Sequence, residues 1–384
     1  MNEIIINSDV SGSPYRGRRG LRVIIAGGGT GGHIFPAIAI ANALKKKVES
    51  VEILFVGARG KMEMEKVPQA GYKIEGLDIV GFNRSSLIKN FSLPFRIIKS
   101  FMQARKIMNE FKPDVVVGVG GYASFPMLRQ AQLRNIPTVI QEQNSFAGKT
   151  NMILAKRAKK ICVANEGMEK FFPKEKIVIT GNPVRDVFSQ SAITRIEGLR
   201  FFDLDENKKT VLVIGGSLGA KSINEAVERH LDELLAAGLQ LIWQTGKPFA
   251  AKAKEGAVGK KGVWVNGFIA QMEYAYAAAD VVISRAGAIA IAELCLMKKP
   301  VLFVPYPFAA EDHQTENALN LVKKNAAMML PDNEAMGQLI PMIIELAKDE
   351  TKQSELRKNI GQLAIRNADE KIADEIIKSL NPSA

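Results

Sequence analysis

The chain has 384 residues, of which 47% are hydrophobic and 24% charged, and its formal net charge is +12. This length predicts two domains, and no apolar run approaches the roughly 20 residues that a membrane-spanning helix needs. The basic charge favours anionic partners, but the sequence has no zinc-finger spacing and no aromatic RNA-binding motif, which argues against nucleic acid. Cys162 and Cys295 lie in apolar stretches, so we expect reduced core thiols in a cytosolic protein.

The chain begins with residues 1–20, which lack the apolar core of a signal peptide and are expected to be a mobile leader. Beyond them, short apolar runs alternate with segments of helical period, a pattern typical of a parallel sheet with helical crossovers. Helices are expected at Pro36–Lys46 and Pro94–Glu110. The strands expected in this first half are Arg22–Ala26, Val51–Val56, Asp114–Val119, Pro137–Ile140, Lys160–Ala164 and Ile177–Thr180.

The same alternation restarts after Gly181–Asn182–Pro183, where glycine and proline indicate a break between two domains. The expected strands are Thr210–Ile214, Leu239–Trp243, Gly262–Val265, Asp280–Ile283 and Pro300–Val304. Helices are expected to begin near Ser222, Met272, Ala290 and Gln314, and two more near Glu355–Arg366 and Asp369–Leu380. The sequence therefore predicts an α/β protein with two Rossmann-like parallel-sheet domains.

Each half contains a strand that ends in glycines and leads into a helix. The turns are Gly27–Gly28–Gly29–Thr30–Gly31–Gly32 and Gly215–Gly216–Ser217–Leu218–Gly219. Such a turn offers free N–H groups at a helix N-terminus, so both are candidate anion sites facing a shared cleft. The first also fits the dinucleotide pattern GxGxxG, and Arg59 after the second strand could hold the 2′-phosphate of NADP, which leaves an oxidoreductase open.

His33 directly follows the first glycine turn, where a side chain would face the cleft. It is either a structural histidine or a catalytic base, and the helix N-terminus favours the neutral ring that a base requires. Gly120–Gly121–Tyr122 and the run Gln141–Glu142–Gln143–Asn144 follow two other strands, at the ends where α/β proteins bind ligands. That run suits carbohydrate hydroxyls or is an ordinary polar loop.

In the second half, Ser284–Arg285–Ala286–Gly287–Ala288 leads from a strand into the helix that carries Glu293. A glutamate at this depth can bind a sugar diol with both oxygens, or is a solvated acid that suits the helix dipole. Pro305–Tyr306–Pro307 then holds an extended loop before Glu311–Asp312–His313–Gln314. These polar side chains either contact hydroxyls or form an acidic cluster at a helix N-terminus.

The segment 86–108 interleaves apolar residues with Lys89, Arg96, Lys99, Arg105 and Lys106. Part of the apolar set must belong to the core, but proline interrupts its first part. Apolar residues beside basic ones are what an anionic bilayer surface attracts. We therefore expect the Leu87–Phe101 region to dock on such a surface.

Together and in this order, these motifs resemble the MurG family of N-acetylglucosaminyltransferases, over nearly the whole chain from Leu21. The motifs are Gly28–His33, Gly120–Tyr122, Glu142–Asn144, Gly181–Arg185, Gly215–Ala220 and Arg285–Glu293. The resemblance implies a GT-B fold, with an acceptor domain at 21–182, a donor domain at 183–366, and a last helix, 367–384, that crosses back to the first domain.

The resemblance also implies the reaction: inverting transfer of GlcNAc from UDP-GlcNAc to the 4-hydroxyl of MurNAc in undecaprenyl-pyrophosphoryl-MurNAc-pentapeptide. This step converts lipid I to lipid II in peptidoglycan synthesis, with links to cell shape and cell division. It would take place at the cytoplasmic face of the bacterial plasma membrane, with a cell-wall synthesis complex as a candidate partner. No cofactor is expected, and because no Asp-x-Asp run lies beside a donor-site strand, we expect no essential metal.

Finally, the resemblance implies roles for matching residues. Arg185 would lie near the uracil, Ile269 would bind that base through its backbone, and Glu293 would bind the ribose. The acceptor side would comprise Thr30, His33, Tyr122 and Asn144, with His33 as the catalytic base. Gly216 and Ser217 would meet the diphosphate, and His313 and Gln314 would hold GlcNAc hydroxyls. The other donor residues would be Thr30, Gly31, Gly32, Asn144, Ala288, Ile289 and Ala290.

Two further classes remain open at this point. A UDP-GlcNAc epimerase shares this kind of twin-domain cleft, but it needs no lipid and would leave Leu87–Phe101 without a purpose. A non-enzymatic sugar-nucleotide-binding partner of another transferase would not need His33 or Glu293, and both residues are present.

Overall fold

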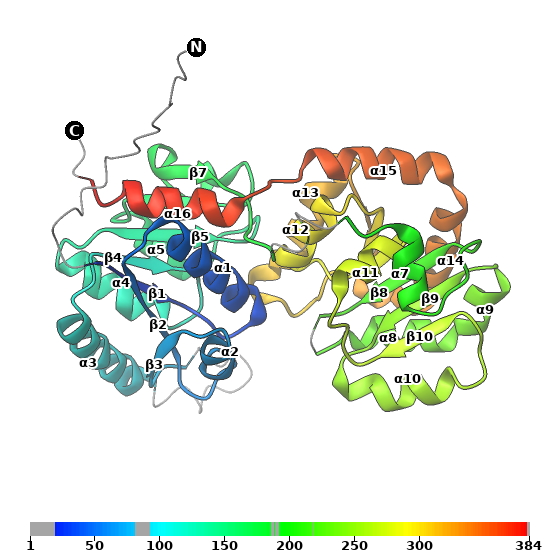
Figure 1. Ribbon diagram of the computed structural model, residues 1–384, viewed down its shortest axis with the longest axis horizontal. Helices are drawn as coiled ribbons and strands as arrows, with labels where there is room; N and C mark the ends of the chain where they lie inside the picture. The colour runs from blue at the N-terminus through cyan, green and yellow to red at the C-terminus, as the bar shows by residue number, and fades with distance from the viewer. Residues whose placement is uncertain (1–19, 81–92, 186–187, 189–191, 217, 382–384) are drawn as a thin grey trace, which may run out of the picture.

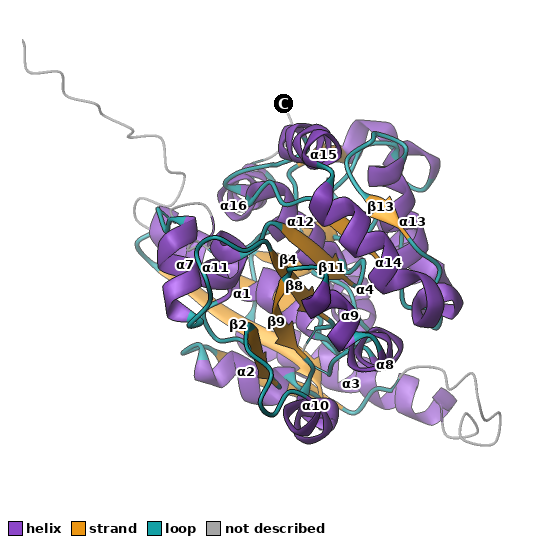
Figure 2. Cartoon of the chain, turned by 90° about the vertical axis from the view of Figure 1, so that its right-hand side faces the viewer, coloured by secondary structure: helices purple, strands orange, loops and turns teal. Residues whose placement is uncertain are grey.

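The computed structural model describes residues 20–80, 93–185, 188, 192–216 and 218–381. These residues form two lobes, each with a parallel sheet enclosed by helices (Figure 1). Figure 2, seen from the second lobe, shows the strands lying between the layers of helices. Residues 1–19 of the expected leader at 1–20, residues 87–92 of the Leu87–Phe101 region, residues 382–384 of the expected last helix and Ser217 lie outside the described residues.

The sheet of the first lobe has the order β3-β2-β1-β4-β5-β6-β7, and every pair is parallel. The strand order reverses between β1 and β4, so the loops after these two strands diverge and leave room for a site. The strands are β1 (Leu21–Ala26), β2 (Val51–Ala58), β3 (Lys73–Leu77), β4 (Val115–Gly118), β5 (Thr138–Glu142), β6 (Lys160–Val163) and β7 (Ile177–Ile179).

Helices cover both faces of this sheet because the crossovers between parallel strands return over it. They are α1 (Gly31–Lys47), α2 (Glu63–Gln69), α3 (Leu93–Phe111), α4 (Ser124–Leu133) and α5 (Lys149–Ala155). The last helix, α16 (Ala368–Lys378), packs on α1 and buries Ile372, Ala373 and Ile376 in the core of this lobe (Figure 1).

The second lobe repeats the plan with the parallel order β10-β9-β8-β11-β12-β13, which reverses between β8 and β11. Its strands are β8 (Thr210–Ile214), β9 (Gln240–Gln244), β10 (Val263–Asn266), β11 (Val281–Ser284), β12 (Val301–Phe303) and β13 (Met328–Met329). Its helices are α7 (Arg195–Phe201), α8 (Lys221–Arg229), α9 (Leu231–Ala236), α10 (Ala250–Gly256), α11 (Met272–Ala278), α12 (Ala288–Leu296), α13 (His313–Val322), α14 (Ala335–Lys348) and α15 (Glu350–Gln362).

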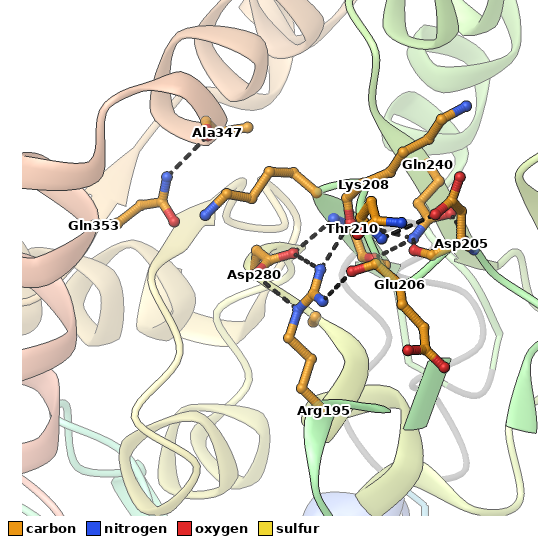
Figure 3. A network of polar contacts seen from close by, with 12 residues as sticks. Arg195, Asp205, Glu206, Lys208, Thr210, Gln240, Asp280, Ala347 and Gln353 are labelled. Carbon is orange, nitrogen blue, oxygen red and sulfur yellow. Dashed lines mark hydrogen bonds and ion pairs between the residues drawn. The ribbon is translucent and has the colours of Figure 1, made fainter. Parts of the chain in front are cut away.

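A polar network fixes the amino ends of the central strands of this lobe (Figure 3). The Asp280 carboxylate accepts the N–H of Thr210 at 2.8 Å and pairs with the Arg195 guanidinium at 3.0 Å. Arg195 also donates to the carbonyl oxygens of Glu206 and Lys208. Because ligands bind at the opposite, carboxyl ends of parallel strands, this network anchors α7 rather than forming a site.

The two lobes touch through α13. The Asn317 side chain accepts the N–H of Ser145 at 2.8 Å and donates to the Asn144 side chain at 3.2 Å. Lys324 reaches Glu166, with 3.4 Å between its Nζ and the carboxylate. The carboxyl ends of the two sheets are thereby held together at what we term the interlobe junction.

Two expectations about the whole chain can be compared with this fold. Cys162 and Cys295 are buried free thiols in different lobes, as expected. No helix among the described residues is long and apolar enough to cross a membrane.

Candidate active site

The first glycine turn lies at the β1/β4 switch point, but its first N–H groups are already bonded. Gly27 donates to the Val56 carbonyl at 3.0 Å and Gly28 donates to the Gly120 carbonyl at 3.2 Å. Gly29 donates to the Glu63 carboxylate at 2.8 Å. This half of the turn is therefore not an open anion site, which corrects the expectation from the sequence.

The open part of the turn is its second half, where α1 begins. Thr30 is the N-cap and is exposed, Gly31 and Gly32 form the start of the helix, and Gly32 is also exposed. The first N–H groups of a helix have no partner within the helix. Thr30, Gly31 and Gly32 therefore remain candidates for contact with a ligand.

His33 is half-buried on the first turn of α1, and its ring is held by the glycine turn. Its Nδ1 lies 3.0 Å from the Gly28 carbonyl oxygen and 3.3 Å from Thr30 Oγ1. A carbonyl oxygen can only accept, so we assign the ring proton to Nδ1, which leaves the Nε2 lone pair able to take a proton. A Cβ at Gly120 would lie 2.7 Å from Nε2, so only glycine there keeps this nitrogen approachable.

The environment of His33 favours its neutral form. Burial lowers the pKa of this imidazole below its ordinary value, although the Glu142 carboxylate, the Gly28 carbonyl and the Glu63 carboxylate act in the opposite direction. His313 of the second lobe also lowers the pKa of His33 across the interlobe junction. A neutral imidazole with an accessible nitrogen can act as a general base near pH 7.

The polar run Gln141–Asn144 starts inside β5 and is mostly structural, which contradicts a role of the whole run in binding carbohydrate. Gln141, Glu142 and Gln143 are buried. Glu142 accepts the Gly148 N–H at 3.1 Å and the Asn151 amide at 2.8 Å, while Gln143 donates to the Val119 carbonyl at 2.8 Å. The buried polar groups are thus satisfied within the lobe.

Tyr122, in the loop after β4, and Asn144, in the loop after β5, are both accessible to a ligand. Asn144 is half-buried and bonds to Asn317 of α13, which places it at the interlobe junction. Tyr122 follows β4 with 55% of its surface exposed.

The second glycine turn, at the β8/β11 switch point, is more open than the first. Gly216 is exposed and has a φ of +78°, a conformation that favours glycine. The described contacts inside the turn use its carbonyl: Gly219 N–H donates to Gly216 O at 3.0 Å, and so does the Gln244 amide at 3.0 Å. Helix α8 begins at Lys221 just beyond it.

Glu293 of α12 lies in a mostly apolar surround with two polar partners. Tyr276 donates its hydroxyl to Glu293 Oε2 at 2.9 Å, and the Arg185 guanidinium lies 3.9 Å from Oε1. Burial raises the pKa of Glu293 to about 7, although Arg185 and the Tyr276 hydroxyl lower it. Oε1 therefore has only the distant Arg185 as a described polar partner, and it can accept a hydroxyl of a ligand.

Other predicted donor residues lie around this acid. Arg185 is exposed and lies over the Phe188 ring, 4.7 Å from its centre. Ile269 is 3% exposed and packs in the same core cluster as Phe188. Ala288, Ile289 and Ala290 are half-buried on the first turn of α12, and the Ala288 carbonyl accepts an amide hydrogen of Asn182 at 3.3 Å.

His313 and Gln314 open α13, next to the loop after β12. Gln314 accepts the Tyr306 N–H at 3.0 Å and so fixes the Pro305–Tyr306–Pro307 loop. Arg285 has a similar role, since it donates to the carbonyls of Val304 and Pro305 at 2.9 and 3.0 Å.

Two Rossmann-like lobes that meet at the carboxyl ends of their sheets are the arrangement of the GT-B class of glycosyltransferases. Residues 23–163 match the model of the glycosyltransferase family 28 N-terminal domain, and residues 210–376 match that of the family 28 C-terminal domain. A crystal structure of Acinetobacter baumannii MurG superimposes with a TM-score of 0.77 and 29% identity, covering 93% of this chain and 99% of that one.

Curated relatives narrow the family further. A Parabacteroides distasonis protein is 53% identical over 365 residues, which are 94% of this chain and 99% of the relative. A Phocaeicola vulgatus protein is 53% identical over 362 residues, 93% of this chain and 96% of the relative. Both are named UDP-N-acetylglucosamine–N-acetylmuramyl-(pentapeptide) pyrophosphoryl-undecaprenol N-acetylglucosamine transferase. The chain belongs to the MurG family of glycosyltransferases.

These findings also bear on two alternatives that the sequence left open, an oxidoreductase and a UDP-GlcNAc epimerase. The oxidoreductase hypothesis is wrong, because both halves of the chain match glycosyltransferase family models, and the Glu63 carboxylate bonds to the glycine turn. A UDP-N-acetylglucosamine 2-epimerase has a TM-score of 0.63 at 12% identity, which shows a shared fold alone.

Three residues of the site had no sequence signal. Glu63 and Tyr276 reach the site from α2 and α11, and Asn317 lies one turn beyond the predicted His313 and Gln314. Their partners are 34, 17 and 173 residues away in the chain, so only the folded structure brings them together.

Proposed function

We propose that this chain transfers GlcNAc from UDP-GlcNAc to the MurNAc 4-hydroxyl of undecaprenyl-pyrophosphoryl-MurNAc-pentapeptide, converting lipid I to lipid II. The observation that carries the proposal is the 53% identity to relatives named for this transfer, over 94% of the chain. It is supported by His33 on the first lobe, whose pKa is lowered by burial, and by the largely buried Glu293 on the second lobe.

The donor nucleotide would bind the second lobe. Glu293 would accept hydroxyls of the ribose, with Arg185 near the uracil and the backbone of Ile269 paired to that base. Ala288, Ile289 and Ala290 would line the sugar nucleotide, and His313 and Gln314 would hold GlcNAc hydroxyls. Gly216 and Tyr306 follow the carboxyl ends of β8 and β12 and are exposed, which supports this placement.

The acceptor would bind the first lobe beside Thr30, His33, Tyr122 and Asn144. A sugar hydroxyl becomes a strong nucleophile as its proton is removed, and His33 Nε2 would remove it as the hydroxyl attacks C1 of GlcNAc. The C1–O bond to UDP breaks on the opposite side, so the anomeric centre inverts. A positioned general base contributes about 10²–10⁴-fold to the rate.

The leaving diphosphate gains negative charge as the bond to C1 breaks. The N–H groups of Gly216 and Ser217 and the dipole of α8 would stabilise it at the second glycine turn. The Asp-x-Asp run Asp203–Leu204–Asp205 precedes the amino end of β8, away from the carboxyl ends where the donor would bind, so we propose that transfer needs no metal.

A peripheral position on the cytoplasmic face of an anionic membrane would bring the enzyme to its lipid-linked acceptor. Helix α3 supports this: Phe95, Ile98 and Met102 are 74%, 59% and 63% exposed, beside exposed basic residues such as Arg96 and Lys106. Its other face is core, with Ala104, Ile107, Met108 and Phe111 buried. An exposed apolar and basic helix face is what an anionic bilayer binds.

The division into a 21–182 acceptor domain and a 183–366 donor domain, with 367–384 returning to the first, is part of this proposal. The packing of α16 on α1 supports the return. A cell-wall synthesis complex at the membrane is a further candidate partner.

The test is a transfer assay with radiolabelled UDP-GlcNAc and a short-chain lipid I analogue, with and without a chelator. We expect a labelled disaccharide lipid in both conditions. Absence of product with native protein would contradict the proposed function, and loss of product with the chelator would contradict the metal-free mechanism alone.

A further inference from the structure

Glu63 is a buried acid to which the proposed reaction gives no role. It begins α2, and 1% of its surface is exposed. Its Oε1 accepts the Ala58 N–H at 2.9 Å and its Oε2 accepts the Gly29 N–H at 2.8 Å. The carboxylate therefore joins the end of β2 to the glycine turn that precedes His33.

Two glycines make the space that this carboxylate occupies. A Cβ at Gly28 would lie 2.4 Å from the Glu63 carboxyl carbon, and a Cβ at Gly57 would lie 2.4 Å from Glu63 Cγ. Real Cβ atoms do not come this close, so the chain is shaped around Glu63 on both sides. The two glycines thus leave a space that fits the Glu63 side chain, and a larger residue at either position would displace it.

The restrained turn in turn restrains His33. The carbonyl of Gly28, next to the Gly29 N–H that Glu63 binds, is the group that His33 Nδ1 contacts at 3.0 Å. This contact determines which ring nitrogen carries the proton and where Nε2 points. The path from Glu63 to the base is therefore one peptide unit with a hydrogen bond on each side of it.

Glu63 also acts on His33 through its charge. Around His33 the charged and titratable groups are Glu63 of α2, Glu142 at the end of β5 and His313 of α13. Glu63 and Glu142 raise the pKa of His33, whereas His313 lowers it. Removing the Glu63 charge should therefore lower the pKa of His33 further.

We propose that Glu63 is a positioning residue for the transfer: its carboxylate holds the first glycine turn so that the Gly28 carbonyl orients the His33 ring, with Nε2 available to the acceptor hydroxyl. The inference rests on the proposed role of His33 as the base. A misplacement of about 1 Å in such a site can reduce turnover by about 10²-fold.

The kinetic test compares Glu63→Gln with Glu63→Asp and a matched control, Asp280→Asn. Asp280 is also a buried carboxylate that accepts a backbone N–H, but it lies at the far end of the second sheet. We expect Glu63→Gln to lower kcat by up to about 10²-fold, with the KM for UDP-GlcNAc unchanged and the acid limb of the kcat profile moved to lower pH. Glu63→Asp keeps the charge but is shorter, so it should lose kcat while leaving the acid limb in place.

A second readout does not depend on activity. The chain has three histidines, so the ring C–H signals of His33, His230 and His313 can be assigned by single substitutions and titrated by NMR. We expect the His33 titration to move to lower pH in folded Glu63→Gln and to stay unchanged in Asp280→Asn.

The outcomes are distinct. Native kcat in Glu63→Gln, an unmoved His33 titration, or equal kinetic losses in Glu63→Gln and Asp280→Asn would overturn the positioning role. If the native protein makes no disaccharide lipid, the proposed function fails, while the NMR titration still reports on the contact between Glu63 and His33.

Discussion

The two lobes share one plan, but they differ at the same position. In both, a glycine turn follows the central strand and opens a helix where the strand order reverses. The first turn is filled by the Glu63 carboxylate, whereas no carboxylate among the described residues bonds to Gly215, Gly216 or Gly219 of the second. A glycine-rich pattern therefore indicates a turn, and the side chains packed behind it decide whether the turn can hold a phosphate.

This difference predicts a division of labour between the lobes. The first turn maintains its own shape and holds His33, while the second remains open to a diphosphate. The following predictions test one lobe against the other, from the largest expected effect to the smallest.

Removing the base of the first lobe should have the largest effect. His33→Ala should lower kcat by about 10²–10⁴-fold, because the acceptor hydroxyl loses its proton acceptor, while the UDP-GlcNAc KM stays near the native value. The transfer assay measures both constants. The matched control is His230→Ala, a histidine that bonds to Glu233 and Met336 outside the site and should leave both unchanged. Full turnover by His33→Ala would exclude His33 as the base.

Removing the acid of the second lobe should act on the donor instead. Glu293→Ala should weaken UDP-GlcNAc binding roughly 10- to 100-fold, because a hydrogen bond to a charged group contributes about 1.5–3 kcal/mol. Titration calorimetry with UDP-GlcNAc measures this without the acceptor. Glu345→Ala, an exposed glutamate of the same lobe, is the control. An unchanged affinity in Glu293→Ala would contradict the ribose role.

The exposed surface of α3 predicts that the first lobe, and not the second, binds the membrane. Phe95→Ser with Arg96→Glu should weaken binding to anionic vesicles by at least roughly 30-fold, since reversing one charge removes about 2 kcal/mol. We avoid Lys99 here, because it pairs with Asp78 at 2.8 Å and its reversal would disturb the lobe itself. Vesicle co-sedimentation measures the effect.

The second lobe offers a control variant for this experiment. Val258 is 79% exposed and Lys254 lies one turn before it, so Val258→Ser with Lys254→Glu also removes one exposed apolar side chain and reverses one basic charge, but away from α3. We expect native vesicle binding from that variant. Equal binding by the α3 variant and native protein would show that α3 is not the docking surface.

The smallest predicted effect is the pH dependence of donor affinity. The pKa of Glu293 is raised to about 7, so the carboxylate becomes ionised, and a stronger hydroxyl acceptor, as the pH rises through 7. Binding of UDP-GlcNAc should tighten by up to about 10-fold between pH 6 and 8, with release of a proton. The same raised pKa means that this group stabilises the fold less as the pH rises from 4.5 through 7. Calorimetry in buffers of different ionisation enthalpy measures the number of protons released on binding. Glu293→Gln should abolish both the pH dependence of the affinity and the proton release.

The sequence predicted the sheets well because buried parallel strands are continuous apolar runs. All eleven strands expected from such runs are present, whereas β3 and β13 had no prediction. Lys73–Leu77 is a polar edge strand, and Met328–Met329 is too short to form a pattern. Propensity and periodicity describe local structure, and these edge strands depend on their neighbours instead.

The sequence predicted some residues of the candidate site correctly and others wrongly. His33 and Glu293 follow strand ends that the alternation located, and both have the burial and partners that a functional group needs. Gln141–Gln143 were also predicted to follow a strand end, but the first two belong to β5, and all three are buried and bonded inside the lobe. Which polar side chains turn inward depends on tertiary packing, and the same packing placed Glu63 and Tyr276 beside the site.

A crystal structure with bound UDP would test the division of labour most directly. We predict that the nucleotide lies against the second lobe, with its ribose at Glu293 and its diphosphate at Gly216. A nucleotide held by Gly27–Gly32 of the first lobe, or bound away from the junction of the two lobes, would contradict the account.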